Sequence, residues 1–271
     1  MTDQDFDFIC KLLRERSAIV LESGKEYLVE SRLAPLAREL QLNSISDLVR
    51  QIRFQPDNGL HVRIVEAMVT TETSFFRDHA PFEALRKVVI PELIKRRQSE
   101  RRLQIWCAAS STGQEPYSVA MLFREHFPEV AGWNLSILAS DISAEMIHRA
   151  KEGRYNQIEA NRGLPIALLM KYFKQHGTSW HLNDDIRRMV QFQEINLAKS
   201  WPPLSRMDLV MIRNVMIYFD VEMKKSILNK IASLLKPDGY LLLGGSETTF
   251  NVVDSFRRVE HLKTGFYQLV S

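Results

Sequence analysis

Residues 105–118 read Ile-Trp-Cys-Ala-Ala-Ser-Ser-Thr-Gly-Gln-Glu-Pro-Tyr-Ser, an apolar run that passes through small residues into a helix-forming stretch. The apolar run predicts a buried strand over 103–107, and Pro116 predicts the start of a helix over 116–126. Small residues between a strand and a helix let a ligand approach the backbone closely, at the carboxyl end of the sheet where open α/β folds bind ligands. Because the GxGxxG spacing is absent, a nucleotide-like ligand and a plain tight turn both stay open, with the ligand favoured.

Alternating strands and helices are predicted through most of the chain after residue 80. The further strands lie over 135–140, 190–195, 207–212, 240–244 and 265–270, and the further helices over 82–97, 144–151 and 222–235. This alternation indicates an α/β fold with a mostly parallel, doubly wound sheet covered on both faces. Residues 237–239, Pro-Asp-Gly, predict a turn. The last strands predict an antiparallel hairpin, because no helix long enough for a crossover lies between residues 259 and 266.

Apolar residues at helical spacing continue through residues 4–70 and predict a four-helix amino-terminal region. Gly24 breaks the pattern before the second helix, and Ser46 is the predicted N-cap of the third. Residues 56–59, Pro-Asp-Asn-Gly, predict the turn before the fourth. This region contains no pattern of a catalytic group.

A polar and aromatic segment interrupts the alternation between residues 154 and 188. It is too long for a simple connecting loop. We therefore predict an inserted subdomain with a short helix and a small hairpin near Gly177.

Composition and charge exclude several protein classes. The 271 residues are 45% hydrophobic and 25% charged, which suits a folded chain with a sizeable core. No uncharged apolar run approaches the roughly 18 residues of a spanning helix, and the first eleven residues contain three aspartates where a signal peptide would be basic. We therefore expect a cytoplasmic protein without direct membrane insertion. The net charge is +3, with 9 basic and 12 acidic residues over 1–75 and 27 basic and 21 acidic residues over 76–271. The excess of basic residues in the second part is too dilute for a nucleic-acid partner.

Several kinds of site have no matching motif. Cys10 and Cys107 are the two cysteines, which predicts two buried thiols and no disulfide framework. The seven histidines lack metal-ligand spacing, and neither GxSxG nor GxxxxGK[ST] occurs. We expect no metal site, no serine hydrolase and no P-loop.

Polar side chains follow three of the predicted strands. Asp141 follows 135–140 and can accept hydrogen bonds from both hydroxyls of a ribose, or it can cap the helix that begins near residue 144. Arg213, Asn214 and Tyr218 follow 207–212, and they are costly to bury without partners. They indicate either a ligand or a structural hydrogen-bond network. Asn196 follows 190–195 in the same way.

Six stretches match one family pattern in the same order. They are residues 70–78, which read Thr-Thr-Glu-Thr-Ser-Phe-Phe-Arg-Asp, and residues 108–117, 140–142, 195–197, 213–219 and 235–239. Together they resemble the bacterial CheR family of chemoreceptor glutamate O-methyltransferases, which use S-adenosylmethionine. The resemblance covers essentially the whole chain, and several long motifs in order are far more specific than any single one.

The resemblance implies an all-helical amino-terminal domain over 1–74 and, over 75–271, a Rossmann-like S-adenosylmethionine-dependent methyltransferase domain with a small β-subdomain inserted at about 154–189. It implies Arg77 and Tyr218 as catalytic residues. The implied partner is the helical bundle of a chemoreceptor cytoplasmic domain, whose glutamates would become methyl esters. The cofactor-binding residues that the resemblance implies are Thr71, Thr73, Arg77, Ala108, Glu115, Asp141, Asn196, Leu197, Arg213 and Asn214.

The chemistry of this reaction agrees with the absence of a catalytic triad. A glutamate carboxylate is already ionised at neutral pH, so the enzyme mainly has to align oxygen, methyl carbon and sulfur. The sulfonium cation and the carboxylate lose charge as the methyl moves, so a desolvated pocket around Phe75, Phe76 and Tyr218 would favour the transition state. Arg77 would orient the carboxylate through a charge-assisted hydrogen bond.

One departure from the family pattern concerns substrate recognition. Some members bind a pentapeptide at the receptor's tail by strand addition to the β-subdomain. Those members have a longer, glycine-richer turn than residues 174–180, Lys-Gln-His-Gly-Thr-Ser-Trp. We therefore predict recognition through the helical domain and the active-site cleft, independent of the pentapeptide. We also expect a monomer, since no long exposed apolar face is evident.

Two other functions stay open. Methyltransferases that act on amides or nucleic-acid amines commonly have Asn-Pro-Pro-Tyr after the fourth strand, where this chain reads Arg-Asn-Val-Met at 213–216. A catalytically silent signalling module would bind the cofactor or a partner through the helical domain. For such a module, changes at Arg77 or Tyr218 would leave activity unaltered.

Overall fold

The computed structural model describes residues 1–54 and 59–270. The chain forms two compact units. The first holds residues 1–70, 197–200 and 218–224, and the second holds residues 71–196, 201–217 and 225 onward. The predicted domain boundary after residue 74 and the predicted limits of the insertion, 154–189, stay predictions.

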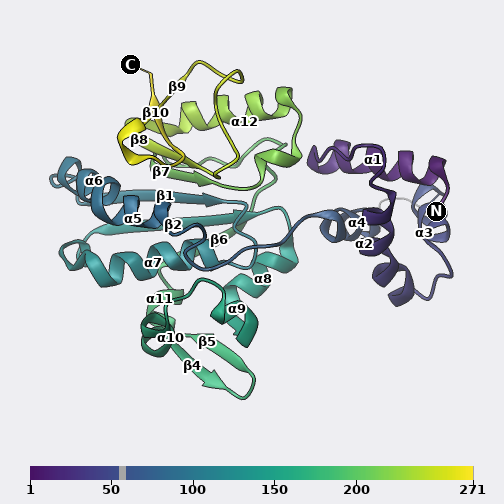
Figure 1. The fold of residues 1–271 in the computed structure, drawn as a ribbon, viewed down its shortest axis with the longest axis horizontal. Coiled ribbons are helices and arrows are strands. Elements are labelled where there is room, and N and C mark those ends of the chain that lie inside the picture. The colour runs from purple at the N-terminus through teal and green to yellow at the C-terminus, as the bar shows by residue number, and fades with distance from the viewer. Residues whose placement is uncertain (55–58, 271) are drawn as a thin grey trace. The chain divides into compact units, whose positions relative to one another are not determined.

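The first unit contains the predicted four-helix region. As far as residues 1–70 are described, they form α1 (Asp3–Ser17), α2 (Glu26–Glu39), α3 (Ile45–Phe54) and α4 (Leu60–Met68) (Figure 1). The apolar spacing of each helix becomes one buried stripe, and the side chains with no exposed surface are Ile9, Leu13, Val29, Leu33, Leu48 and Ile64. The predicted turn at 56–59 falls, except for its last residue, outside the described residues.

Hydrogen bonds at the helix starts correct one predicted cap. Thr2 and Asp5 form a capping box that begins α1. The predicted Ser46 cap of α3 is wrong, because Ser44 Oγ accepts the hydrogen bond from Asp47 N at 3.1 Å. Ser46 instead donates to Asp5 Oδ2 at 2.6 Å, which links α3 to α1. Ser44 and Ser46 are equally good N-cap residues by type, so the sequence could not show which one caps α3. The contact of Ser46 with α1 decides it.

The second unit is built on a mixed sheet with the order β6-β2-β1-β7-β8-β10-β9. The strands are β1 (Arg102–Ala108), β2 (Asn134–Asp141), β6 (Val190–Glu194), β7 (Met207–Ile212), β8 (Leu235–Leu243), β9 (Phe256–Arg258) and β10 (Phe266–Leu269). The strands from β6 to β8 in this order are parallel, and β10 is antiparallel to both β8 and β9. The α/β fold and its antiparallel end are confirmed. β9 was not predicted, since three residues with one buried side chain carry no alternation signal.

Helices cover both faces of this sheet. Figure 1 shows α7 (Gln114–His126) and α8 (Ala144–Glu152) on one face and α12 (Val221–Leu234) on the other. Right-handed crossovers require this arrangement, because the chain moves one way across the sheet from β1 to β6 and the opposite way from β7 to β8. The direction changes between β1 and β7. Open α/β sheets bind ligands at the carboxyl ends of the strands beside such a switch point.

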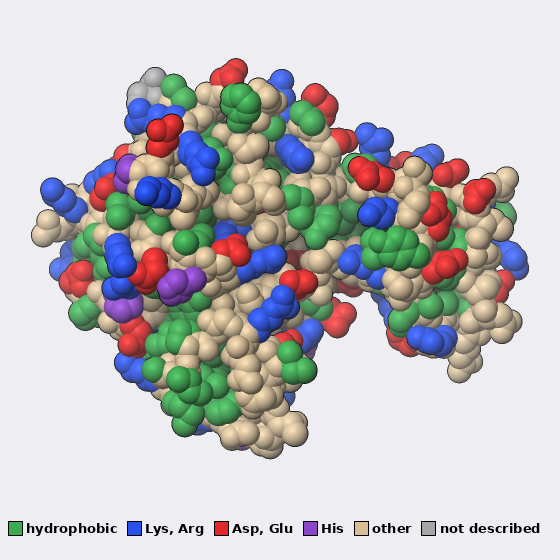
Figure 2. Space-filling model, viewed as in Figure 1, with side chains coloured by type: hydrophobic (Ala, Val, Ile, Leu, Met, Phe, Trp, Pro, Cys, Tyr) green, Lys and Arg blue, Asp and Glu red, His purple; other side chains and the backbone are tan. Residues whose placement is uncertain are grey.

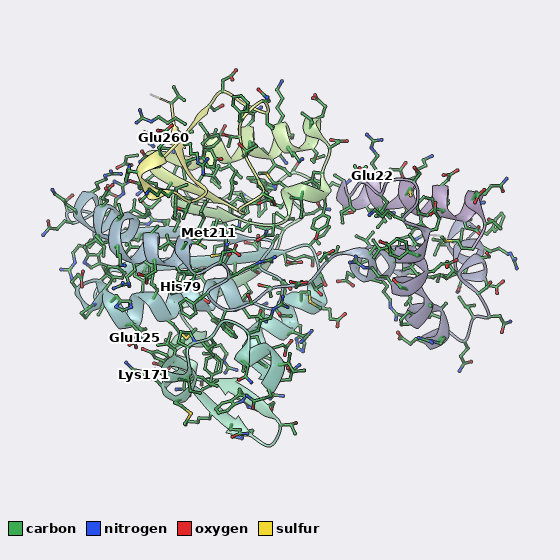
Figure 3. The ribbon with its side chains drawn as sticks, viewed as in Figure 1. Glu22, His79, Glu125, Lys171, Met211 and Glu260 are labelled. Carbon is green, nitrogen blue, oxygen red and sulfur yellow. The ribbon has the colours of Figure 1, made fainter. Side chains whose placement is uncertain are left out.

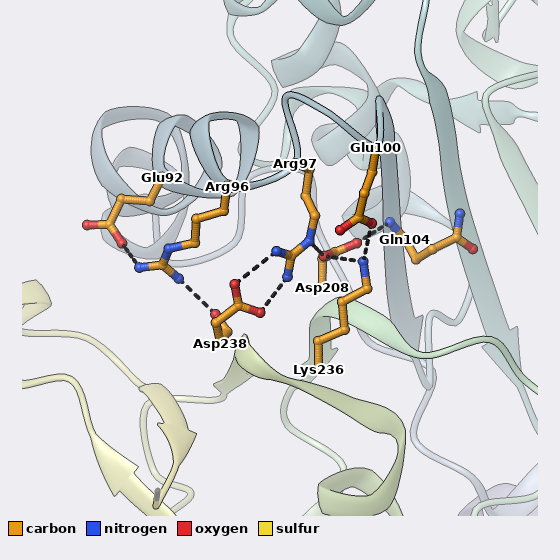
Figure 4. Close-up of polar contacts among 8 residues, drawn as sticks. All are labelled: Glu92, Arg96, Arg97, Glu100, Gln104, Asp208, Lys236 and Asp238. Carbon is orange, nitrogen blue, oxygen red and sulfur yellow. Dashed lines mark hydrogen bonds and ion pairs between the residues drawn. The ribbon is translucent and has the colours of Figure 1, made fainter.

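A buried ion cluster occupies the opposite ends of β1 and β7 (Figure 4). Arg97 follows a continuous helix made of α5 (Ala80–Ala84), the π-helical turn Leu85–Val89 and α6 (Ile90–Arg96). Its Nε donates to the fully buried Asp208, and its NH1 donates to Asp238 Oδ2 at 2.9 Å. The residues of the predicted turn, 237–239, fall within the bounds of β8, at an irregularity where residues 236–239 stand opposite the single residue Asp208 of β7. The ion pair to Arg97 holds Asp238 at that irregularity.

A separate three-stranded antiparallel sheet forms the insertion. Its strands β3 (Arg154–Asn156), β4 (Phe173–His176) and β5 (Ser179–Leu182) have the order β3-β5-β4, accompanied by α9 (Gln157–Asn161), α10 (Ile166–Tyr172) and α11 (Asp184–Arg187). The two residues Gly177 and Thr178 connect β4 to β5, so the predicted hairpin is present. Lys171 Nζ lies 2.6 Å from Glu125 Oε1, which ties α10 to α7 (Figure 3).

Hydrophobic side chains gather on the part of the surface that carries this small sheet and its helices (Figure 2). The large exposed ones there are Ile158, Ile166 and Met170. No helix in the described ranges is long and apolar enough to cross a membrane.

Candidate functional site

The loop between β1 and α7 turns sharply at the carboxyl end of β1. After Ala108, the last residue of the strand, Ala109 and Ser111 have positive φ angles of 55° and 48°, which are uncommon for residues with a side chain. Gly113, at φ 90°, is the N-cap of α7. A Cβ at Gly113 would lie 3.1 Å from Ala150 Cβ, so glycine lets the loop pack closely on its neighbours.

Two buried tyrosines support this loop and its surroundings. Tyr155, at the start of the small sheet, donates its hydroxyl to Thr112 O at 2.8 Å. Tyr117 of α7 donates to Ala150 O at 2.7 Å, at the end of α8. Burial raises the pKa of both hydroxyls, so both remain neutral donors.

Asp141 joins the ends of β1 and β2. Its Oδ2 accepts a hydrogen bond from Ser111 N at 2.8 Å, and its Oδ1 accepts one from Ser143 N at 3.0 Å. Ser143, not Asp141, is the N-cap of α8, since its side chain accepts from Met146 N. The carboxylate of Asp141 instead lies beside the small-residue loop, where the sequence predicts a ribose.

The segment 71–78 is held against this loop from several sides. Thr71 O accepts from Ser111 Oγ at 2.7 Å, and Phe76 N donates to Ser118 Oγ at 3.0 Å. The Phe75 ring is fully buried and packs edge-on against Tyr155 at 5.0 Å between ring centroids. The expectation that Phe75 lines a pocket is therefore wrong, because its ring is part of the core that connects the segment to the small sheet.

Arg213 joins three separate parts of the chain. Its NH1 donates to Glu115 Oε2 at 2.7 Å, and its NH2 donates to Asp78 Oδ2 at 2.6 Å and to Arg77 O at 3.2 Å. The Arg213 side chain is 2% exposed and that of Glu115 is 11% exposed, whereas Asp78 is half exposed. Arg77 itself donates to the backbone oxygen of Glu72 at 3.2 Å, the upper end of the usual range. The network fixes the end of β7, the start of α7 and the segment 71–78 relative to one another.

Three buried polar atoms near this network have no hydrogen-bond partner among the described residues. They are Ser110 Oγ, Arg213 Nε and Asn214 Oδ1. All three belong to residues within two positions of the carboxyl end of β1 or β7, where this type of fold binds ligands. Buried donors and acceptors are normally paired, so a polar ligand with both donors and acceptors fits these positions.

Most of the predicted cofactor residues lie in the second unit around this loop. Thr71, Ala108, Glu115, Asp141 and Arg213 belong to the contacts already described. Asn214 follows Arg213 with φ 59°, and Asn196 follows Ile195, whose N–H donates to Asp141 O at 2.9 Å. Thr73 is half-buried in the segment 71–78, and Arg77 lies beside Asp78.

Leu197 and Tyr218 belong to the first unit. There Tyr218 O accepts from Val20 N at 3.0 Å, and Ile19 pairs with Phe219 in an antiparallel bridge. The roles predicted for Leu197 and Tyr218 stay predictions.

Several residues of the network were missed from sequence. Ser111 and Asp78 lie within the motifs at 108–117 and 70–78, but the motifs do not show that these residues make the hydrogen bonds of the network. Glu247 accepts backbone hydrogen bonds from the turn after β7. In the sequence it is visible only as an acidic residue after Gly244 and Gly245, which follow a strand. Cys107 of β1 is fully buried, and burial raises the pKa of its thiol.

Comparison with known proteins identifies the family. Residues 71–264 match the domain described as "CheR methyltransferase, SAM binding domain", and residues 4–68 match "CheR methyltransferase, all-alpha domain". The chain belongs to the CheR family. It is 42% identical over 260 residues to chemotaxis protein methyltransferase 1 of Pseudomonas aeruginosa, covering 94% of each chain. It is 39% identical over 262 residues to chemotaxis protein methyltransferase 1 of Vibrio cholerae, covering 96% of this chain and 94% of the relative.

Solved structures show a weaker similarity. The glycopeptide N-methyltransferase MtfA complexed with sinefungin is 13% identical, with a TM-score of 0.36 over 63% of this chain and 50% of its own. The family assignment therefore depends on the sequence matches.

The donors and acceptors at the ends of β1, β2 and β7 fit the S-adenosylmethionine of a CheR methyltransferase domain. They include the carboxylate of Asp141 and the unpaired polar atoms of Ser110 and Asn214. Arg213 is neutralised by Glu115 and Asp78, so the site does not present a net positive charge to a sulfonium cation.

Proposed function

We propose that this protein transfers the methyl group of S-adenosylmethionine to glutamate carboxylates in the cytoplasmic domains of chemoreceptors, forming glutamate methyl esters. The observation that carries the proposal is the Arg213–Glu115–Asp78 network with unpaired Ser110 and Asn214 atoms beside it, in a chain of the CheR family. The names of the relatives, chemotaxis protein methyltransferases, support the choice of chemoreceptors as substrate.

The residues of this chain would act by binding and orientation. Bound S-adenosylmethionine supplies an electrophilic methyl group, and the substrate carboxylate is ionised at neutral pH without a base. The chain therefore has to hold the two in line and exclude water. We propose that Arg77 orients the carboxylate and keep Tyr218 as the second proposed catalytic residue. The hydrogen bond from Arg77 to Glu72 O is compatible with the role of Arg77, since a charged carboxylate is a stronger acceptor than a neutral backbone carbonyl.

Methyl transfer to chemoreceptors tests the proposal. Membranes that contain the host's chemoreceptors are incubated with S-adenosylmethionine labelled in the methyl group, and the product is then treated with alkali. We expect label on receptor-sized bands that alkali releases as volatile methanol, because esters hydrolyse in base. Alkali-stable label would indicate amide or amine methylation instead. Cofactor binding without any transfer would favour a silent signalling module.

We also propose that recognition does not use a receptor-tail pentapeptide. In support, β4 is a four-residue edge strand that is followed by a two-residue turn. Its last three residues, Lys174, Gln175 and His176, are all exposed. A short polar edge offers little for strand addition. Calorimetry with excess pentapeptide should detect no binding, and low-micromolar affinity would overturn this part.

We further propose that the protein works as a monomer in the cytoplasm. Light scattering of the purified chain, with and without S-adenosylhomocysteine, should give the mass of one chain at every concentration tested. A concentration-dependent rise to twice that mass would contradict this.

A further inference from the structure

The carboxylate of Glu247 accepts hydrogen bonds from four backbone N–H groups in the second unit. Its Oε2 accepts from Gly244 N at 2.7 Å and from Asn214 N at 2.8 Å. Its Oε1 accepts from Val215 N at 2.9 Å and from Met216 N at 2.8 Å. Glu247 is 8% exposed, so these contacts are shielded from water. One side chain therefore joins the turn after β8 to the turn after β7.

The backbone after β7 creates the need for such an acceptor. Strand residues give their N–H groups to neighbouring strands, but residues 214–216 have left the sheet. Asn214 has φ 59°, and this left-handed turn aims three successive N–H groups at one point. Converging backbone N–H groups form a concavity that favours an anion. A single neutral carbonyl could not accept all of them, whereas a carboxylate has about four lone-pair sites.

The space around Glu247 is shaped for this contact. Gly244 has no side chain, and a Cβ there would lie 2.7 Å from Glu247 Oε2, 2.9 Å from Asn214 N and 3.0 Å from Asn214 Nδ2. Glu247 N also donates to Gly244 O at 3.0 Å, which closes the turn that carries the carboxylate. Glycine at position 244 therefore lets the two turns approach closely.

We propose that Glu247 is a positioning residue for cofactor binding. It holds residues 214–216 so that the unpaired Asn214 Oδ1 and the neighbouring Arg213 keep the positions at which a ligand meets them. The inference rests on the proposed function only in taking S-adenosylmethionine as the ligand of this site. Glu247 acts through the backbone of the turn and makes no contact with the reacting atoms.

Glu247→Gln is the main test, with S-adenosylhomocysteine as the probe. An amide keeps one oxygen, so one of the two pairs of N–H groups would face an NH₂ group, and two buried donors would lose their acceptor. We expect the affinity for S-adenosylhomocysteine, measured by calorimetry, to fall about 30-fold. Amide hydrogen exchange should accelerate at residues 214–216 while the amides of β1 and β7 stay protected. In methyl transfer, KM for S-adenosylmethionine should rise more than kcat falls.

Two further variants make the result specific. Glu260→Gln carries the same substitution on an exposed glutamate of the same unit (labelled in Figure 3) and should bind S-adenosylhomocysteine like the unchanged protein. Glu247→Asp keeps the charge but is shorter by one methylene group, so it should bind more weakly than the unchanged protein and more tightly than Glu247→Gln.

The outcomes separate this inference from the proposed function. Unchanged affinity in Glu247→Gln would overturn the inference. So would rapid exchange across the whole sheet in both Glu247 variants, because the carboxylate would then stabilise the fold as a whole. Failure of the unchanged protein to methylate receptors would reject the proposed function, while the binding and exchange results would still decide the role of Glu247.

Discussion

Replacement of Arg213 by methionine removes the central charge of the site network. The Arg213 side chain is 2% exposed and lies 2.7 Å from Glu115, which is 11% exposed, and 2.6 Å from Asp78, which is 51% exposed. Methionine keeps most of the apolar stem but leaves Glu115 buried without its partner. Loss of one member of a buried pair costs about 3–5 kcal/mol, and the half-exposed Asp78 pair adds about 0–1 kcal/mol. We expect the free energy of unfolding to fall by about 4 kcal/mol.

A double-mutant cycle separates this charge effect from a packing effect. Glu115→Gln alone should cost about 2 kcal/mol, because Arg213 keeps Asp78 as a partner. In the combined variant no buried carboxylate is left unpaired, so the cost should fall to about 3 kcal/mol, and the coupling energy between the two changes should be about 3 kcal/mol.

Urea unfolding followed by tryptophan fluorescence measures each corner of the cycle. Arg257→Met, at an exposed arginine of β9, is the matched control and should change stability by less than about 0.5 kcal/mol. Calorimetry should also show that Arg213→Met loses affinity for S-adenosylhomocysteine. Costs that add within about 0.5 kcal/mol would refute the reasoning, because independent sites behave in that way.

Three further predictions concern the packing and the acid–base behaviour of the second unit. Gly163→Ala should lower the free energy of unfolding by more than about 2 kcal/mol, because a Cβ there would lie 2.1 Å from Phe75 O at a φ of 82°; an unchanged melting temperature would contradict this. Burial raises the pKa of Tyr240 to about 12 from 10.0, so its contribution to stability is complete below pH 10 and is lost as the pH rises toward 12. In unfolding experiments at alkaline pH, Tyr240→Phe should therefore show a smaller loss of stability between pH 10 and 12 than the unchanged protein. The hydrogen bond from Arg97 lowers the pKa of Asp238 below 3.8, so its contribution is complete above that value and is lost as the pH falls through the lowered pKa; Asp238→Asn should make stability less sensitive to acid, and equal acid sensitivity in both proteins would count against the ion pair.

The regular elements of the second unit were predictable because their burial repeats along the chain. β7, whose six residues are all buried, was predicted with both ends correct, and α7 and α12 were predicted to within two residues at each end. Periodic burial is a local property, so the sequence carries it directly. Local sequence predicted a turn at 237–239 but not the contact that is made there. Asp238 is held inside β8 by Arg97, a residue far away in the chain, and local turn chemistry cannot anticipate that contact.

The sequence by itself determined which types of residue stand at the ends of the strands, and through the order of its motifs it determined the family. Asp141, Arg213 and Asn214 were identified in this way, because a polar side chain directly after an apolar run is visible without a structure. Only the tertiary structure decided what these groups bind. Asp141 joins two turns instead of capping α8, and Arg213 is neutralised by carboxylates that come from two other segments. The role of Glu247 could not be predicted for the same reason. Its carboxylate accepts hydrogen bonds from residues about thirty positions earlier in the chain, and no local sequence pattern shows that these residues come together.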